Sequence, residues 1–178
     1  MVNMRPFTAF EQKNLKFLVN HNVKFTQVEI TPTGLGKGIL DSTAPMRAYF
    51  LENGIHNYEG QLQGQEHKQI KQACILTDAT QFFTKASFYR PNTKKGDPRM
   101  WIYGFGSYTE GNDIHVLFWH EQTLYSINIT HIDIDKCYNS AIITPIQDIL
   151  KAINKEGNIV SEEILGRFRA VNDKWFES

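Results

Sequence analysis

The sequence predicts a mainly β protein with flanking helices, folded as an open β pseudobarrel. Aromatic residues make up 12% of the 178 residues, with 12 Phe and 7 Tyr, and aromatic side chains favour strands. Several apolar segments of five to eight residues are separated by short polar turns, which is typical of strands. Short strands at this spacing indicate a barrel or an open pseudobarrel.

The first third of the chain predicts two helices, one strand and a loop. Apolar residues at roughly helical spacing predict a helix over residues 7–20, and the alternation in VKFTQVEI predicts a strand over residues 23–30. Three glycines at every second position predict that residues 31–43 form a flexible projecting loop. A Ser-Thr pair that can cap a helix, with a proline soon after it, predicts a helix over residues 44–53.

The rest of the chain predicts five strands and a helical end. The strands are expected at residues 69–76, 82–89, 100–105, 113–119 and 124–129, the last two joined by a short HEQT hairpin turn. A helix is expected over residues 145–154, and Ser161, followed by Glu162 and Glu163, predicts another. We therefore expect an N-terminal helix (1–21), a pseudobarrel (22–142) and a helical appendage or linker to another domain (143–178).

Composition narrows the classes of function. The formal net charge is zero, so binding to nucleic acid would depend on local charge. No apolar run is long enough to span a membrane, and the N-terminus lacks a signal pattern. Cys74 and Cys137 are far apart and lack metal-ligand spacing, which favours reduced core thiols. We expect a cytoplasmic protein with no cofactor of its own.

The polar segment at residues 90–99 has the strongest local charge. It contains four basic residues and one acidic residue, and its candidate DNA-binding residues are Arg90, Asn92, Lys94, Lys95, Asp97 and Arg99. Arg and Lys can bind guanine, Asp the cytosine amino group and Asn adenine, while the cations can also bind phosphates. The alternative is a hairpin loop that is charged only because it is solvated.

The glycine-rich segment at residues 31–43 is the second candidate. GLGKG lacks the spacing of a phosphate-binding loop, so an ATP site is not indicated. A groove-entering arm fits better: glycines permit a close approach to DNA, Lys37 can reach a base or a phosphate, and Thr31 and Thr33 can bind phosphates. Asp41 completes the candidate residues of this segment.

Two other functions remain open: a metal-dependent nuclease, and a module that binds an acidic protein partner. Glu66-His67-Lys68 and Glu11-Gln12-Lys13 both fit an acidic-x-Lys nuclease pattern, but such short matches are common by chance. Asp41 is the only nearby acid that could complete an ion site. His115 and His120 are expected on opposite faces of one strand, and His131 follows later, so packing rather than metal binding is expected of the histidines. We expect no catalytic and no metal-binding residue.

The order of the elements resembles a known family. A strand (VKFTQVEI) leads to a polar arm (TPTGLGKGILDST) and a short helix, and a later strand (KASFY) leads to a second arm (RPNTKKGDPR) and a strand (MWIYGF). This order resembles the effector-binding N-terminal domains of EcoRII-type (Type IIE) restriction endonucleases, which share the DNA-binding pseudobarrel of plant B-three domains. Both arm segments also resemble stretches found ahead of MvaI-type nuclease domains.

The resemblance implies a function. The two arms would clasp double-stranded DNA from the major-groove side, at a short site such as CC(A/T)GG. The chain would be a monomeric, non-catalytic effector domain that controls a fused nuclease domain, and Mg²⁺ would act in that domain. Lys95, Asp97 and Arg99 fit the family's alternation of basic and acidic residues, but Gly96 and Pro98 interrupt it, so individual base assignments do not transfer.

Overall fold

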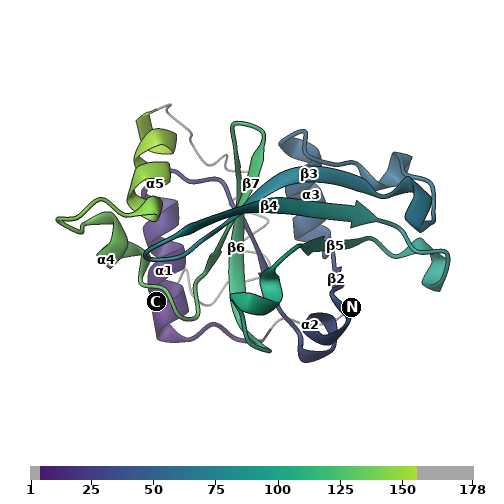
Figure 1. Ribbon diagram of the computed structural model, residues 1–178, viewed down its shortest axis with the longest axis horizontal. Coiled ribbons are helices and arrows are strands. Elements are labelled where there is room, and N and C mark those ends of the chain that lie inside the picture. Colours follow the sequence, from purple (N-terminus) through teal and green to yellow (C-terminus); the bar gives the residue numbers. More distant parts are fainter. Residues whose placement is uncertain (1–4, 156–178) are drawn as a thin grey trace.

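The computed structural model describes residues 5–155 and forms one seven-stranded mixed sheet with flanking helices (Figure 1). The strands are β1 (Thr26–Glu29), β2 (Leu40–Asp41), β3 (Gln69–Leu76), β4 (Gln81–Tyr89), β5 (Arg99–Ile102), β6 (Ile114–His120) and β7 (Thr123–Asn128). The helices are α1 (Ala9–Asn20), α2 (Pro32–Lys37), α3 (Ala44–Glu52), α4 (Ile134–Tyr138) and α5 (Pro145–Lys155). Single 3₁₀ turns occur at Tyr58–Gly60, Gln65–His67, Lys94–Gly96 and Phe105–Ser107.

The sheet is an open pseudobarrel, as the sequence predicted. Its strand order is β1-β6-β7-β3-β4-β5-β2, and only the β3–β7 pair is parallel. The two edge strands, β1 and β2, do not pair with each other, although residues 30–39 connect them directly. We call this unpaired junction the seam; it places α2 at the opening of the sheet.

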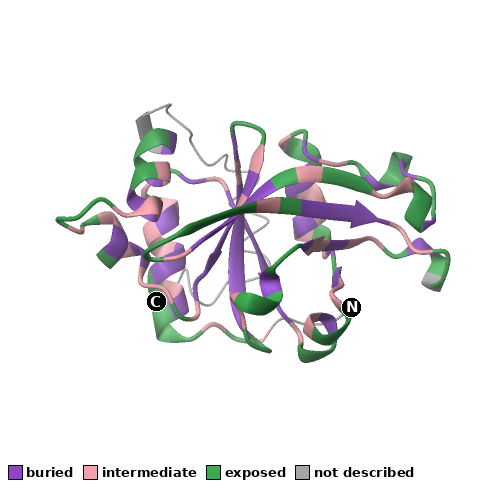
Figure 2. Cartoon of the chain, in the orientation of Figure 1, coloured by how far each residue is buried: buried purple, intermediate pink, exposed green. Residues whose placement is uncertain are grey.

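The central strands of the sheet are buried on both faces. One face packs under α1, α4 and α5, which Figure 1 shows together on one half of the molecule, while α3 packs against the other face. In β6, Ile114, Val116 and Phe118 face the helices, whereas Leu117 faces α3. A strand that is buried on both faces does not alternate polar with apolar side chains, because all of its side chains face the core. That is why IHVLFWH is almost continuously apolar and why its ribbon is buried along its length in Figure 2.

The structure corrects several expected boundaries. Residues 31–43 are not a flexible loop, because they contain α2 and the edge strand β2. β1 begins at Thr26, three residues later than predicted, β5 ends at Ile102, and α4 was not predicted. The predicted HEQT hairpin turn is confirmed: Glu121 and Gln122 both have positive φ, at 46° and 66°, as a two-residue primed turn requires. The helix expected after Ser161 lies outside the described residues.

The N-terminal helix is anchored to the sheet through one buried carboxylate. Thr8 and Glu11 form a capping box at the start of α1. The Glu11 carboxylate also accepts hydrogen bonds from Arg5 and from the Thr130 hydroxyl, which follows β7. These bonds outweigh burial, which by itself would raise the pKa of Glu11, and hold that pKa below its usual value.

Two further sequence-based expectations can be compared with this fold. Cys74 and Cys137 are free and buried, as predicted, and both belong to the core between the sheet and the helices α1, α4 and α5, Cys74 from β3 and Cys137 from α4. Among residues 5–155, no helix combines the length and apolar character that crossing a membrane requires.

Candidate nucleic-acid interface

The first arm, residues 31–39, is an ordered helical turn. Thr31 caps α2 by accepting a hydrogen bond from Gly34 N (3.0 Å), Pro32 opens the helix, and Gly38 ends it with a φ of 67°. Gly34 is buried so tightly that a Cβ there would lie 2.6 Å from Ile39 O. Thr33 and Lys37 remain exposed on this turn. The Thr-Pro start and glycine end are a recognisable capping signature, which the alternating glycines obscured in the sequence.

The second arm, residues 90–98, is braced from its base. Arg90 Nε donates to Gly96 O (2.9 Å), and Arg90 Nη1 donates to Gln61 O (3.1 Å). Gly64 N also donates to Arg90 O (2.7 Å), so the connection between α3 and β3 supports the arm. A single Arg therefore joins the start of the arm, its turn and a neighbouring segment.

The tip of the second arm is exposed. Asn92, Lys95 and Asp97 are all exposed, and Gly96 between them is buried. Lys95 has a φ of 57° and Gly96 a φ of 71°, which places two consecutive residues in the left-handed region. Lys94 begins this 3₁₀ turn. The turn thus presents Lys95 and Asp97 on either side of a fixed glycine.

The arms leave opposite ends of the short ribbon formed by β2 and β5. These strands pair antiparallel, Leu40 with Met100 and Asp41 with Arg99. The first arm runs into Leu40 and the second runs into Arg99, so one arm lies at each end of the pair. Figure 1 shows both arms on the half of the molecule away from α1, α4 and α5.

Asp41 and Arg99 form an ion pair at the end of this ribbon where the second arm enters β5. Arg99 Nε lies 3.0 Å from Asp41 Oδ1, although it lacks the alignment of a hydrogen bond. The Asp41 side chain is 69% exposed and the Arg99 side chain only 14%. Sequence reasoning named both residues separately but could not pair them, because they are distant in the chain.

A pocket of about 340 Å³ lies at the seam. It is lined by residues of β1, the first arm, β2 and the start of β5, and these include five of the predicted DNA-binding residues: Thr31, Thr33, Lys37, Asp41 and Arg99. The structure therefore gathers these five at one place, and the second arm holds Arg90, Asn92, Lys94, Lys95 and Asp97.

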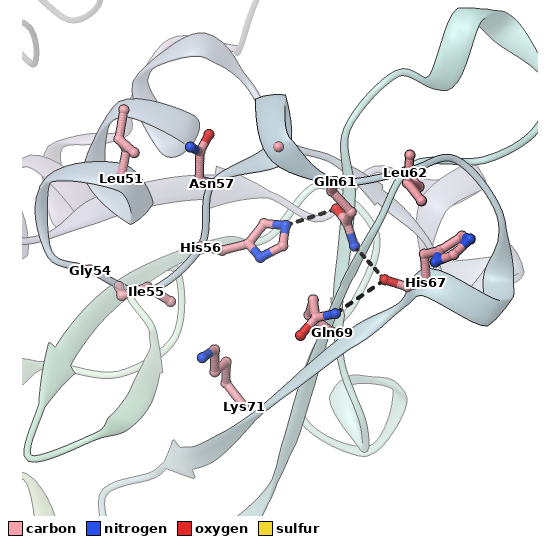
Figure 3. Close-up of a pocket in the computed structure, with 11 residues that line it drawn as sticks. Leu51, Gly54, Ile55, His56, Asn57, Gln61, Leu62, His67, Gln69 and Lys71 are labelled. Atoms are coloured by element: carbon pink, nitrogen blue, oxygen red, sulfur yellow. Dashed lines mark hydrogen bonds between the residues drawn. The ribbon is translucent and has the colours of Figure 1, made fainter.

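A larger pocket of about 550 Å³ lies beside the base of the second arm (Figure 3). Gln61 organises it: its amide donates to His67 O and Phe88 O, both at 2.9 Å, and its carbonyl oxygen accepts from His56 Nε2 at 2.8 Å. Burial, together with the charge of Lys71, lowers the pKa of His56 below its usual value, although the hydrogen bond with Gln61 opposes this shift. Since Gln61 O also accepts from Arg90, this pocket is connected to the second arm through a single residue.

The residues of the nuclease alternative do not form an ion site with Asp41. Glu66 is exposed beside His67, Lys68 lies over the ring of Tyr89 (5.2 Å), and Asp41 pairs with Arg99. Glu11, of the other acidic-x-Lys match, is buried against Arg5.

A different cluster brings Glu110, Asp113 and His131 together. It is the only group of three such residues in the described part of the chain whose potential ligand atoms lie within 4.8 Å of one another. Asp113 Oδ2 accepts hydrogen bonds from Glu110 N (2.8 Å), Asn128 Nδ2 (2.9 Å) and the Thr109 hydroxyl (3.2 Å), and Oδ1 lies 3.1 Å from His131 Nε2. The carboxylate thus closes the turn before β6, and its oxygens are occupied by the protein itself.

Comparison of the chain with protein-family models, curated proteins and solved structures found no match. The function must therefore be inferred from the residues and the geometry of the arms.

Proposed function

We propose that this chain binds double-stranded DNA in a sequence-specific manner, with one arm entering the major groove from each end of a short site. By its resemblance to the EcoRII-type effector domains, it would be the non-catalytic target-recognition part of a Type IIE restriction endonuclease. A fused nuclease domain using Mg²⁺ would perform the cleavage, and the site would be of the type CC(A/T)GG. The chain would act as a monomer.

The observation that carries this proposal is the placement of two ordered polar arms at opposite ends of the β2–β5 ribbon. Arms that are already ordered need not pay the entropy of ordering when they bind. The major groove of B-DNA is about 12 Å wide and exposes a distinct set of donors and acceptors for each base pair. The exposed side chains of the arms, Lys37, Asn92, Lys95 and Asp97, include the types that read such sets.

The charge distribution supports the same proposal. The chain as a whole is neutral, so it would not be drawn strongly to any polyanion. Basic residues are nevertheless concentrated in the second arm. This combination favours moderate affinity for random DNA and places most discrimination in base contacts.

The test is binding of the whole chain to labelled duplexes, measured by fluorescence anisotropy over a range of salt concentrations. We expect tighter binding to a duplex bearing CC(A/T)GG, or to a site selected from random duplexes, than to its scrambled counterpart. Lys95→Ala should reduce the slope of log K against log salt by about 0.9 if Lys95 contacts a phosphate. Lys136→Ala removes an exposed lysine on α4, on the opposite half of the molecule, and should leave the slope unchanged.

Three results would count against the proposal. Equal affinity for cognate and scrambled duplexes would remove sequence-specific reading. Binding to heparin as tight as to cognate DNA would instead favour the alternative of an acidic protein partner. A plasmid incubated with the chain and Mg²⁺ should stay intact; cleavage that Glu66→Ala abolishes would favour the nuclease alternative.

A further inference from the structure

We propose that Asp41 is a specificity-determining residue that accepts a hydrogen bond from the N4 amino group of a cytosine, and that Arg99 is the residue that positions it. This inference rests on the proposed function, since it assigns one contact of the DNA interface. Considered by itself, an arginine such as Arg99 would be expected to bind guanine; here we assign it a positioning role instead.

The exposures of the two side chains assign their roles. Asp41 is 69% exposed, whereas Arg99 is 14% exposed. The two residues are paired directly across β2 and β5, with Arg99 Nε 3.0 Å from Asp41 Oδ1. A base edge in the groove can approach the exposed carboxylate, while the guanidinium lies largely covered beside it. Arg99 therefore acts through Asp41.

The backbone around Arg99 is held firmly enough for that role. The Tyr58 hydroxyl donates to Arg99 O (2.9 Å) and accepts a hydrogen bond from the Ser42 hydroxyl (2.6 Å). Ser42 N in turn donates to Pro98 O (2.9 Å). Both residues of the ion pair are thus attached to neighbours that fix the β2–β5 ribbon.

The Asp41 carboxylate keeps its capacity to accept hydrogen bonds. The contact from Arg99 Nε is not aligned as a hydrogen bond, so it contributes charge rather than occupying a lone pair. An ionised carboxylate has about four acceptor positions and no donor. Among the groups of a DNA duplex, Asp41 can therefore bind only one that donates a hydrogen.

That restriction points to a base and away from the DNA backbone. Phosphate groups carry only acceptors and a negative charge, so a carboxylate between the arms disfavours any register that presents a phosphate there. In the major groove the amino groups belong to cytosine and adenine, and Asp or Glu pairs typically with cytosine N4. Asp41 would thus contribute specificity by two routes, attraction to one base and repulsion of the backbone.

The experiment replaces each cytosine of the cognate duplex, one at a time, by the 2-pyrimidinone nucleotide, which lacks the amino group. With the wild-type chain we expect one position at which affinity falls by about tenfold to a hundredfold. With Asp41→Ala, the same replacement should have no further effect, because the two changes remove one shared contact. Asp148→Ala, which removes an exposed acid of α5 on the opposite half of the molecule, should keep the full loss at that position.

Asp41→Asn, Arg99→Lys and Arg99→Met complete the set. Asp41→Asn preserves size, so it serves if Asp41→Ala does not fold. Its neutral amide oxygen still accepts a hydrogen bond but without the assistance of charge, so the variant should weaken the cytosine preference without losing affinity for scrambled DNA. Arg99→Lys keeps the charge that Arg99 supplies beside Asp41, so it should retain most of the cytosine preference. Arg99→Met removes that charge, so it should weaken the preference while Asp41 remains in place.

The outcomes separate this inference from the proposed function. If the wild-type chain prefers its site but Asp41→Ala stays sensitive at every cytosine, the role of Asp41 is overturned and the proposed function stands. If the sensitive position is an adenine, shown by replacement with purine, the assignment to cytosine is overturned. If the wild-type chain does not discriminate between cognate and scrambled duplexes, the proposed function itself fails.

Discussion

Arg90 should act as a brace for the second arm rather than as a charge for phosphate. Its guanidinium donates to Gly96 O and Gln61 O, which joins the turn of the arm to the α3–β3 connection. Arg90→Met keeps most of the side-chain length and removes both donors. Arg90→Lys keeps the positive charge, but its single ammonium group cannot reproduce the planar fork that reaches two carbonyl oxygens.

The expected loss follows from these two bonds. A hydrogen bond with a charged donor contributes about 1.5–3 kcal/mol when it is buried, and Arg90 is half-buried, so about 1 kcal/mol for each bond is reasonable. We therefore expect Arg90→Met to lower the free energy of unfolding by about 2 kcal/mol. For a chain of this length, that corresponds to a fall in Tm of about 4–8 °C.

Thermal unfolding and DNA binding of both variants, measured together, test this reasoning. If Arg90 is a brace, Arg90→Lys and Arg90→Met should behave alike, with similar losses of stability and of cognate affinity. Amide hydrogen exchange should also accelerate at Gly96, whose N–H donates to Thr93 O at 2.9 Å. If Arg90→Lys instead keeps wild-type stability and affinity while Arg90→Met flattens the salt dependence by about one unit, Arg90 contacts phosphate and the brace is refuted.

Three other substitutions or treatments have clear expectations. Gly34→Ala should destabilise the chain by about 1–3 kcal/mol and weaken DNA binding, because the added Cβ would lie 2.6 Å from a backbone oxygen. Gly36→Ala should do neither, because nothing lies within 4 Å of the added Cβ. Equal Tm values for the two variants would contradict this expectation. The folded chain lowers the pKa of Glu11 below its usual value of 4.5. The ionised Glu11 carboxylate therefore contributes fully to the free energy of unfolding above pH 4.5, and this contribution disappears as the pH falls through the lower pKa of the folded chain. Glu11→Gln should therefore be less stable at pH 7 and should lose less stability on acidification than the wild type, as urea unfolding at several pH values would show. Burial raises the pKa of Cys74 to about 11. At neutral pH the native chain should therefore react with a thiol reagent far more slowly than the chain in denaturant. Equal rates would show that Cys74 is accessible.

The sequence predicted the elements whose signals are local. The strands at β3, β4, β6 and β7 have runs of β-branched, aromatic or apolar residues bounded by turn residues, and all four are present close to their expected limits. The helix α3 has a Thr cap and a proline in its first turn, and it also lies where it was predicted. These features depend on neighbouring residues alone.

The features that were missed depend on contacts between distant segments. β2 has only two residues, which is too short for any alternation, and it exists because β5 pairs with it. The first arm was expected to be flexible because glycine permits many conformations. In the structure Gly34 is instead needed for a close backbone approach, and Gly38 ends a helix. The ion pair of Asp41 with Arg99 and the contact of Arg90 with Gln61 likewise join residues that only the folded sheet brings together.

The open seam explains how one small sheet can hold two independent arms. The first arm connects the two edge strands, so its position depends on β1, β2 and the close packing of Gly34. The second arm connects β4 to β5, and it depends on the Arg90 brace and on Gln61. Among residues 5–155, no hydrogen bond joins one support to the other, and the arms are linked through β2 and β5, where Asp41 pairs with Arg99 and Ser42 N donates to Pro98 O. A substitution in that pair can therefore affect both arms, whereas changes in either support should act on one arm and combine additively.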